Sequence, residues 1–352
     1  MNENNIYFIK LRSIVIVIYC FSILLSSYSS AVSADGASQA PAQPRVRPPV
    51  KTSTLPEQDL WERIRLDLSW QTVEKPQIDS ARRELLRQRN YLPAMTARAD
   101  NYLYYIVEEV QKRDMPIEIA FIPLVESSLN PFASGPSGAA GLWQILPETG
   151  IHLGLEQNSR YDGRRSLQDS TTVALDYLET LYKEFDDDWL LAVAAYNSGA
   201  GNVTRAREAN AAKGLNTDFW SLNLPRHTEE YIPKIIALAQ IVADPEHFDV
   251  DIPAVENAPA FEVAEPSRPL AMAQAAKLAG VDVSTMRALN PGALGQSVTP
   301  NEAGEILVPI GTRNRFETNI AQLTPEEVVQ WQTYRIKSGD SLHLIAKRFG
   351  DQ

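Results

Sequence analysis

The stretch Ile117–Gln144 reads IEIAFIPLVESSLNPFASGPSGAAGLWQ, and a single carboxylate, Glu126, joins its apolar first part to a loop of small residues. A Met-Pro pair precedes it, and proline suits a helix start because the N–H it lacks has no partner there. At about 100° per residue, Ile119, Ile122 and Glu126 share one stripe, while apolar residues cover the other side. We therefore expect a buried helix that ends near Glu126.

A carboxyl at the C-terminal end of an apolar helix is a candidate general acid. Burial removes water from Glu126, and the negative end of the helix dipole opposes its ionisation, so both effects raise its pKa. A carboxyl that remains protonated near neutral pH can donate a proton in catalysis. A lone glutamate is more often a solvated or arginine-paired helix end, so the assignment depends on the motifs around it.

Composition limits the possible functions. The chain has 352 residues, of which 44% are hydrophobic and 22% charged, enough for two or three domains with real cores. The formal net charge of -11 argues against nucleic acid as a partner. The four histidines and the one cysteine are scattered without metal-ligand spacing, so we expect no metal and no cofactor.

The N-terminal residues 1–34 have the order of an export signal. Lys10 and Arg12 precede an apolar run over Ile14–Leu25, and small residues lead up to Asp35. The apolar run is short for a bilayer span. We expect export to the periplasm or cell envelope, with cleavage before Asp35; if the segment stays uncleaved, it associates the protein with the membrane.

Two later segments add to the apolar stretch. The prolines and glycines over residues 127–141 prevent a regular element and allow a ligand to approach the backbone closely. Trp143 either packs in the core, the usual place for tryptophan, or stacks on a sugar ring. The string DDDWLLAVAAYNSGAGNV predicts a helix capped within Asp186–Asp188 and stopped at Asn197–Gly199.

Four motifs together resemble the soluble lytic transglycosylase domain, glycoside hydrolase family 23. They are Glu126-Ser127, Gly141-Leu142-Trp143-Gln144, Ala195-Tyr196-Asn197-Ser198-Gly199, and Tyr231 within Thr228–Lys234. The longer strings around them are similar to the family's membrane-bound branch. The resemblance implies a mainly α, lysozyme-like α+β domain that cleaves the β-1,4 bond between N-acetylmuramic acid and N-acetylglucosamine in peptidoglycan.

The resemblance also implies roles for individual residues. Glu126 would act first as acid and then as base, so that the muramoyl 6-hydroxyl attacks the anomeric carbon and gives a 1,6-anhydro end. The substrate-binding residues it implies are Gly141, Trp143, Gln144, Tyr196, Asn197 and Tyr231, with Ser134 or Ser137 from the loop. Ordinary glycosidases need a second carboxylate. Asp162, Asp169 and Asp176 lie downstream, but simpler structural roles suit them.

Two other functions remain open from the sequence. One is a hydrolytic muramidase similar to goose-type lysozyme, which shares the fold but releases reducing ends. The other is a non-catalytic peptidoglycan-binding protein, against which the intact Glu126 argues. In each case the expected partner is the glycan strand of peptidoglycan, and we expect the protein to be a monomer.

The C-terminal part predicts a different module. After proline-containing residues, the string AMAQAAKLAGVDVSTMRALNPGALGQSVTPNEAGEILVPIG resembles a degenerate LysM module, a small βααβ fold, and TYRIKSGDSLHLIAKRFGDQ resembles the first half of another. The expected divisions are a signal peptide at 1–34, a proline-rich linker at 35–58, an N-terminal helical region at 59–96, a catalytic domain at 97–250, a LysM-like module at 258–312 and an incomplete LysM module at 333–352. We expect the part after residue 258 to be dispensable for cleaving soluble fragments.

Overall fold

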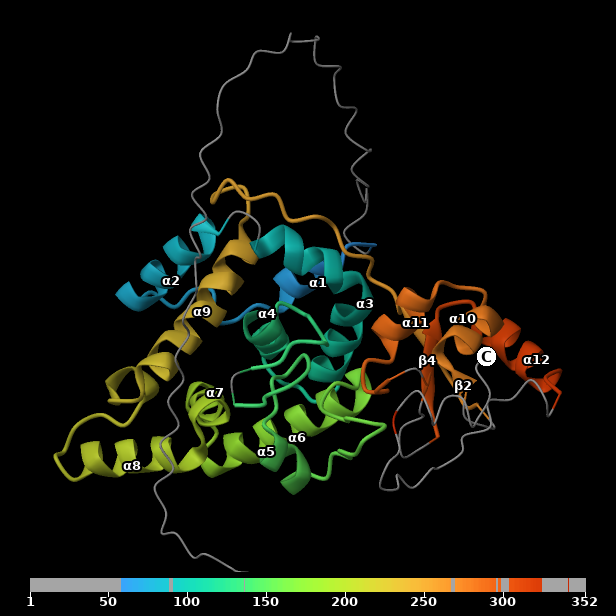
Figure 1. Ribbon diagram of the computed structural model, residues 1–352. Helices are drawn as coiled ribbons and strands as arrows, with labels where there is room; N and C mark the ends of the chain where they lie inside the picture. Colours follow the sequence, from blue (N-terminus) through green and yellow to red (C-terminus); the bar gives the residue numbers. More distant parts are fainter. Residues whose placement is uncertain are drawn as a thin grey trace, which may run out of the picture.

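The computed structural model describes residues 58–88, 91–135, 137–266, 270–295, 297–298, 304–324 and 341. The predicted export signal, nearly all of the predicted linker and, except for Ser341, the predicted incomplete module at 333–352 lie outside the described residues. Within them the protein is mainly helical, as the sequence predicted. A large helical body is followed by a smaller module that contains all the assigned strands (Figure 1).

The helical body is built around one central element. Its α-helices are α1 (Leu60–Asp67), α2 (Pro76–Arg87), α3 (Tyr91–Gln111), α4 (Ile122–Ser127), α5 (Pro147–His152), α6 (Leu167–Glu184), α7 (Trp189–Ser198), α8 (Ala200–Ala211) and α9 (Arg226–Ala243), with 3-10 turns η2 (Ile117–Phe121) and η3 (Phe219–Ser221). Helix α2 lies along α9, and α6 lies along α7. Elements α3, α4 and α9 all contact η2, which therefore lies at the centre (Figure 1).

The predicted single helix after Met115 is two helices. The 3-10 turn η2 ends at Phe121, and α4 begins at Ile122 with Pro123 in its first turn. Pro123 has no N–H, and in a continuous α-helix its ring would clash with the carbonyl of Ile119. The chain therefore closes one short helix and starts another, and Pro123 occupies the position where proline is tolerated.

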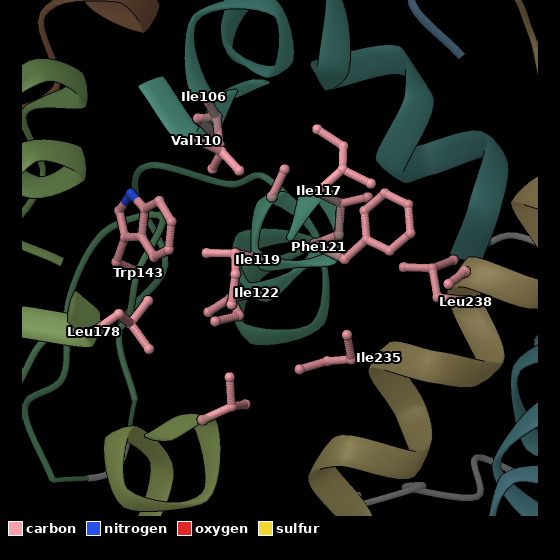
Figure 2. Close-up of a cluster of buried hydrophobic side chains, with 14 of the residues drawn as sticks. Ile106, Val110, Ile117, Ile119, Phe121, Ile122, Trp143, Leu178, Ile235 and Leu238 are labelled. Atoms are coloured by element: carbon pink, nitrogen blue, oxygen red, sulfur yellow. The ribbon is translucent and has the colours of Figure 1, made fainter. Parts of the chain in front are cut away.

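The predicted burial of this segment is confirmed. The side chains of Ile119 and Ile122 are fully buried, and so is that of Phe121. Figure 2 shows them between Trp143 and Leu178 on one side and residues of α9 on the other. Because every face of the segment contacts apolar neighbours, its position in the body is fixed.

One polar residue lies within this apolar centre. Glu118 of η2 is fully buried, and its Oε1 accepts hydrogen bonds from the backbone N–H groups of Ser69 and Trp70, each at 2.6 Å. Its Oε2 lies 3.2 Å from the Ser69 hydroxyl, which donates to it. The carboxylate therefore ties the segment after α1 to η2, since its removal would leave buried donors without acceptors.

We predict that Glu118→Ala lowers the free energy of unfolding by roughly 2–5 kcal/mol, because two N–H groups lose charged acceptors. Denaturant-induced unfolding measures the change. Glu148→Ala, at an exposed position in the first turn of α5, serves as the control and should change stability by about 0.5 kcal/mol or less. Equal effects of the two substitutions would contradict an anchoring role for Glu118.

The C-terminal module has the predicted βααβ order. Strand β1 (Phe261–Ala264) pairs antiparallel with β4 (Ile306–Pro309), and α10 (Met272–Ala279) and α11 (Val283–Leu289) lie between them in sequence. A second short pair joins β2 (Leu270–Ala271) to β3 (Ser297–Val298). Helix α12 (Arg313–Ala321) begins after the predicted end of the module at residue 312, and its Phe316 is buried in the module's core.

The module is packed against the helical body. The Tyr102 hydroxyl of α3 donates a 2.8 Å hydrogen bond to the carbonyl of Ala288 in α11, and Figure 1 shows α11 beside α3. Two residues of the module, Leu289 and Leu307, belong to the core of the body. Removing the part after residue 258 would therefore expose part of that core, and its dispensability for cleaving soluble fragments stays a prediction.

Candidate active site

Glu126 lies in the last turn of α4, where the chain reverses sharply. Helix α4 ends at Ser127, and the next two residues, Ser128 and Leu129, have φ of 51° and 57°. Their N–H groups bond back to the carbonyls of Leu124 and Pro123. The fully buried side chain of Leu129 fixes this turn, so the half-buried carboxyl of Glu126 sits at a defined helix end.

The environment of Glu126 favours its protonated form. Desolvation by the surrounding protein raises its pKa from 4.5 to about 7, while the nearby Tyr231 hydroxyl, as a donor, opposes the rise. The sequence also predicted that the pKa of Glu126 is raised. The Tyr231 hydroxyl is buried and, among the described residues, has no partner in full hydrogen-bond geometry. We read the pair as close but imperfectly aligned, so the hydroxyl remains available to donate.

Two tyrosines from different helices surround this carboxyl. Tyr196 of α7 and Tyr231 of α9 both have pKa values well above 10, first because of burial and then because of the charge on Glu126. Both therefore keep their protons at any ordinary pH. The Tyr196 hydroxyl donates a 2.9 Å hydrogen bond to the carbonyl of Trp143, so of the two tyrosines Tyr231 is the one that can donate to Glu126.

Asn197, the neighbour of Tyr196 on α7, has an unused acceptor. Its Oδ1 is buried and has no hydrogen-bond partner among the described residues. The predicted cap and stop of this helix are confirmed: the Asp188 carboxylate accepts from two N–H groups of the first turn, and Gly199 ends the helix with φ of 87°. A buried acceptor without a donor is rare in a folded protein and marks a place for a ligand or water.

The loop after Glu126, residues 130–145, is held as a small antiparallel structure. Bridges join Ser134 to Ala140 and Ala140 to Ile145. Gly141 adopts φ of 80°, and a Cβ there would lie 2.0 Å from the carbonyl oxygen of Arg164. Gly141 is buried and allows two backbones to approach closely, while a contact with substrate stays a prediction.

Three other predicted residues lie on this loop. Gln144 adopts φ of 49° and donates from Nε2 to the Gly141 carbonyl at 2.8 Å, so its amide is already used to hold the loop. Ser134 and Ser137 are both exposed. The Ser134 hydroxyl accepts a 2.7 Å hydrogen bond from Arg165. The Ser134 hydroxyl is therefore already hydrogen-bonded to an arginine side chain.

The ring of Trp143 packs in the core and offers no face on which a sugar could stack. Its side chain is fully buried among apolar neighbours (Figure 2). Its Nε1 donates to the Thr171 hydroxyl at 2.9 Å. Of the two possibilities for Trp143, the core position is the correct one, and the residue serves the site through its carbonyl.

An ionic cluster beside the loop escaped the sequence analysis. The buried Asp162 carboxylate accepts from Arg164 Nε and Nη2 at 2.9 and 2.8 Å. Arg164 also donates to the carbonyl of Gly138, and Arg165 donates to those of Pro131 and Ala133. The signal in the sequence was an aspartate followed closely by two arginines, in YDGRRS.

The other downstream aspartates also have structural partners. Asp169 accepts a 2.6 Å hydrogen bond from the Tyr161 hydroxyl, and exposed Asp176 pairs with Arg113. Within the described part of the chain, no group of three or more His, Cys, Asp or Glu residues could hold a metal ion. The arrangement thus offers one protonated carboxyl, a tyrosine donor and a free amide acceptor.

We predict that Glu126→Gln changes how stability depends on pH. The unfolded chain releases the Glu126 proton near 4.5 but the folded protein only near 7. This carboxyl therefore stabilises the fold fully below pH 4.5 and loses that contribution as pH rises through 7. The variant should gain roughly 1–3 kcal/mol relative to wild type between these limits.

Unfolding experiments at a series of pH values measure this difference. Glu148→Gln, which removes an exposed carboxyl from the first turn of α5, is the matched control and should show no comparable slope. A constant difference between wild type and Glu126→Gln across the range would mean that Glu126 titrates like an exposed glutamate.

Comparison with known proteins gives matches to both parts of the chain. Residues 104–219 match the transglycosylase SLT domain, and residues 261–324 match the LysM-like domain of lytic transglycosylase MltD. Membrane-bound lytic murein transglycosylase D of Escherichia coli K12 is 38% identical over 309 residues, covering 85% of this chain and 68% of that protein.

Other matches are shorter. A putative tributyltin chloride resistance protein of an Alteromonas strain is 39% identical over 168 residues, which is 48% of this chain and 79% of that protein. The soluble lytic murein transglycosylase of Salmonella typhimurium is 32% identical over 117 residues, covering 32% and 18%. A solved complex of the 70 kDa soluble lytic transglycosylase with bulgecin A aligns over 53% of this chain and 32% of that one, with 19% identity and a TM-score of 0.35.

Proposed function

The chain belongs to the family of membrane-bound lytic murein transglycosylase D, and on this premise we propose that it cleaves the N-acetylmuramic acid–β-1,4–N-acetylglucosamine bond of peptidoglycan, with Glu126 as its catalytic residue. The observation that carries the assignment is the half-buried carboxyl of Glu126, whose pKa is raised to about 7. At neutral pH a large fraction of this carboxyl is protonated, and after giving up its proton it is a base of useful strength.

The reaction needs both forms of Glu126 in turn. The protonated carboxyl donates to the glycosidic oxygen, the bond from that oxygen to the muramoyl C1 breaks, and the N-acetylglucosamine hydroxyl leaves. The carboxylate then accepts the proton of the muramoyl 6-hydroxyl, and the oxygen of that hydroxyl forms a bond to C1. No water is consumed, and Glu126 is protonated again. Tyr231, which keeps its proton, can stabilise the carboxylate between the two steps by donating to it.

Asn197 suits recognition of the sugar's acetamido group. Its buried Oδ1 has no donor among the described residues, and an N-acetyl sugar supplies an amide N–H. A site that pairs its buried acceptor only with the correct ligand discriminates strongly against sugars that lack that donor. Gln144 and Tyr196 act on the site indirectly. Gln144 holds the loop through the Gly141 carbonyl, and Tyr196 is bonded to the Trp143 carbonyl.

The alternative of a hydrolytic muramidase requires a group that activates water, commonly a second carboxylate. The three nearest aspartates downstream of Glu126 are already engaged: Asp162 with Arg164, Asp169 with Tyr161 and Asp176 with Arg113. This favours the intramolecular 6-hydroxyl as nucleophile. A purely binding protein would have no use for a carboxyl held near neutral pKa.

We predict that Glu126→Gln lowers turnover of peptidoglycan by about 10³–10⁴-fold or more. Glutamine has a similar shape but cannot donate the proton, and general acid-base catalysis contributes about 10²–10⁴-fold, of which a residue that acts as both acid and base should supply the upper part. The loss should appear in kcat rather than KM. Wild-type products should be lighter than hydrolytic fragments by one water and should lack reducing ends, as mass spectrometry of digested sacculi would show.

Glu179→Gln, at an exposed position on α6, controls for loss of one negative charge and should retain wild-type turnover. Reducing muramic acid ends in the wild-type digest would identify a hydrolase instead. Full activity of Glu126→Gln would show that another residue is the acid.

We further propose that the protein works in the cell envelope on glycan strands, as a monomer exported by residues 1–34. The support is the order of basic, apolar and small residues in that segment. Among the described residues, no helix has the length and apolar character that a membrane span requires.

N-terminal sequencing of the exported protein is expected to start at Asp35. An intact Met1 on protein recovered from the membrane would instead show that the N-terminal segment is retained as an anchor.

A further inference from the structure

We propose that the C-terminal module sets the shape of the active-site loop, residues 130–145, and that Asp162 is the positioning residue through which it does so. This inference rests on the proposed function, because it concerns the loop beside Glu126. Asp162 contacts both parts: its backbone contacts the module, and its carboxylate binds the arginines that donate to the loop.

The contact with the module is made by main chain. Tyr161 and Ala293 form an antiparallel bridge, flanked by a 2.9 Å hydrogen bond from Asp162 N to the Gly292 carbonyl and a 2.8 Å bond from Leu294 N to the Arg160 carbonyl. The segment before Asp162 thus pairs with the segment after α11 as two short strands would. These two hydrogen bonds, one on each side of the bridge, fix both the distance between the two segments and their register.

This approach leaves little room for a side chain at Gly292. A Cβ at Gly292 would lie 3.0 Å from the Tyr161 ring and 3.2 Å from the Asp162 carbonyl oxygen. Both distances are shorter than ordinary van der Waals contact. A methyl group there must push the module away from residues 161–162 or shift those residues, so the fit of Gly292 reports directly on the position of Asp162.

The second contact runs from Asp162 to the loop. Its carboxylate binds Arg164 through two hydrogen bonds and lies 3.8 Å from Arg165. The three side chains are only 11–17% exposed, so these charge-assisted bonds are shielded from water. The arginines then donate to five groups of the loop: the carbonyls of Pro131, Ala133, Gly138 and Ile145 and the hydroxyl of Ser134.

A shift of Asp162, Arg164 and Arg165 must also move the loop, because the two are in close contact. The carbonyl of Arg164 lies directly against Gly141, where even a Cβ would have no room. Gly141 in turn accepts the hydrogen bond from Gln144, and the neighbouring Trp143 carbonyl holds the Tyr196 hydroxyl near Glu126. Displacement of Asp162 by the module is therefore transmitted through rigid contacts to residues beside the carboxyl.

The test compares full-length Gly292→Ala, Asp162→Asn and the double variant with wild type. Gly292→Ala should lower kcat about tenfold with little change in KM, since small displacements of a positioned group reduce rate strongly. Asp162→Asn should lower kcat at least as much. If both act along one route, the double variant should be no slower than Asp162→Asn alone, because interacting sites are not additive.

Amide hydrogen exchange provides a readout that general loss of stability would not reproduce. In Gly292→Ala and Asp162→Asn, exchange at Ala140 and Gly141 should become faster while exchange within α7 stays as in wild type. Gly201→Ala is the matched control: it also adds one methyl to a glycine, but that methyl meets only the mobile end of Arg205 at 3.4 Å. It should leave kcat and loop exchange unchanged.

Multiplicative losses of kcat in the double variant, or unchanged loop exchange in Gly292→Ala, would overturn the proposal. If Asp162→Asn does not fold, Arg165→Lys replaces it in the same comparison, because lysine keeps the charge but loses the fork that reaches two carbonyls. Failure of the proposed function is seen separately, as reducing ends in the wild-type products, whereas the coupling is read from exchange and from relative rates.

Discussion

Removal of water from one carboxyl is the constraint on which the rest of the structure depends. The carboxyl of Glu126 must be shielded from water enough to keep its proton near neutral pH, and it must still be accessible to a glycan. The buried pair of helices η2 and α4 meets both demands, because Pro123 breaks the segment and turns its last residues toward the site. The core fixes this segment on all sides, Glu118 fastens its start, and Ser128 and Leu129 reverse the chain directly after it.

The sequence predicted what periodicity and local chemistry encode. The burial of Ile119 and Ile122, the raised pKa of Glu126, the Asp188 cap and the Gly199 stop all follow from residue type and spacing. It also predicted the mainly helical class and the βααβ order of the module. These features share one property: the residues from which they were predicted are neighbours in sequence.

The sequence left open what depends on a partner far along the chain. Trp143 can pack or stack, and only its bond to Thr171 and full burial show that it packs. Gly141 suggested a ligand, and the structure shows the Arg164 backbone close against it. Residues 292–294 join the body through carbonyls and N–H groups, which every sequence possesses, so no side-chain pattern could reveal that contact.

A docking surface made of main chain has a consequence for how such modules are exchanged. Side chains around the bridge between Tyr161 and Ala293 are free to diverge, provided that the residue at position 292 stays small. A module grafted from another protein would therefore need one small residue and a strand edge of the right length more than it would need overall similarity. Recombination could thus replace the module while leaving its contact with the helical body intact.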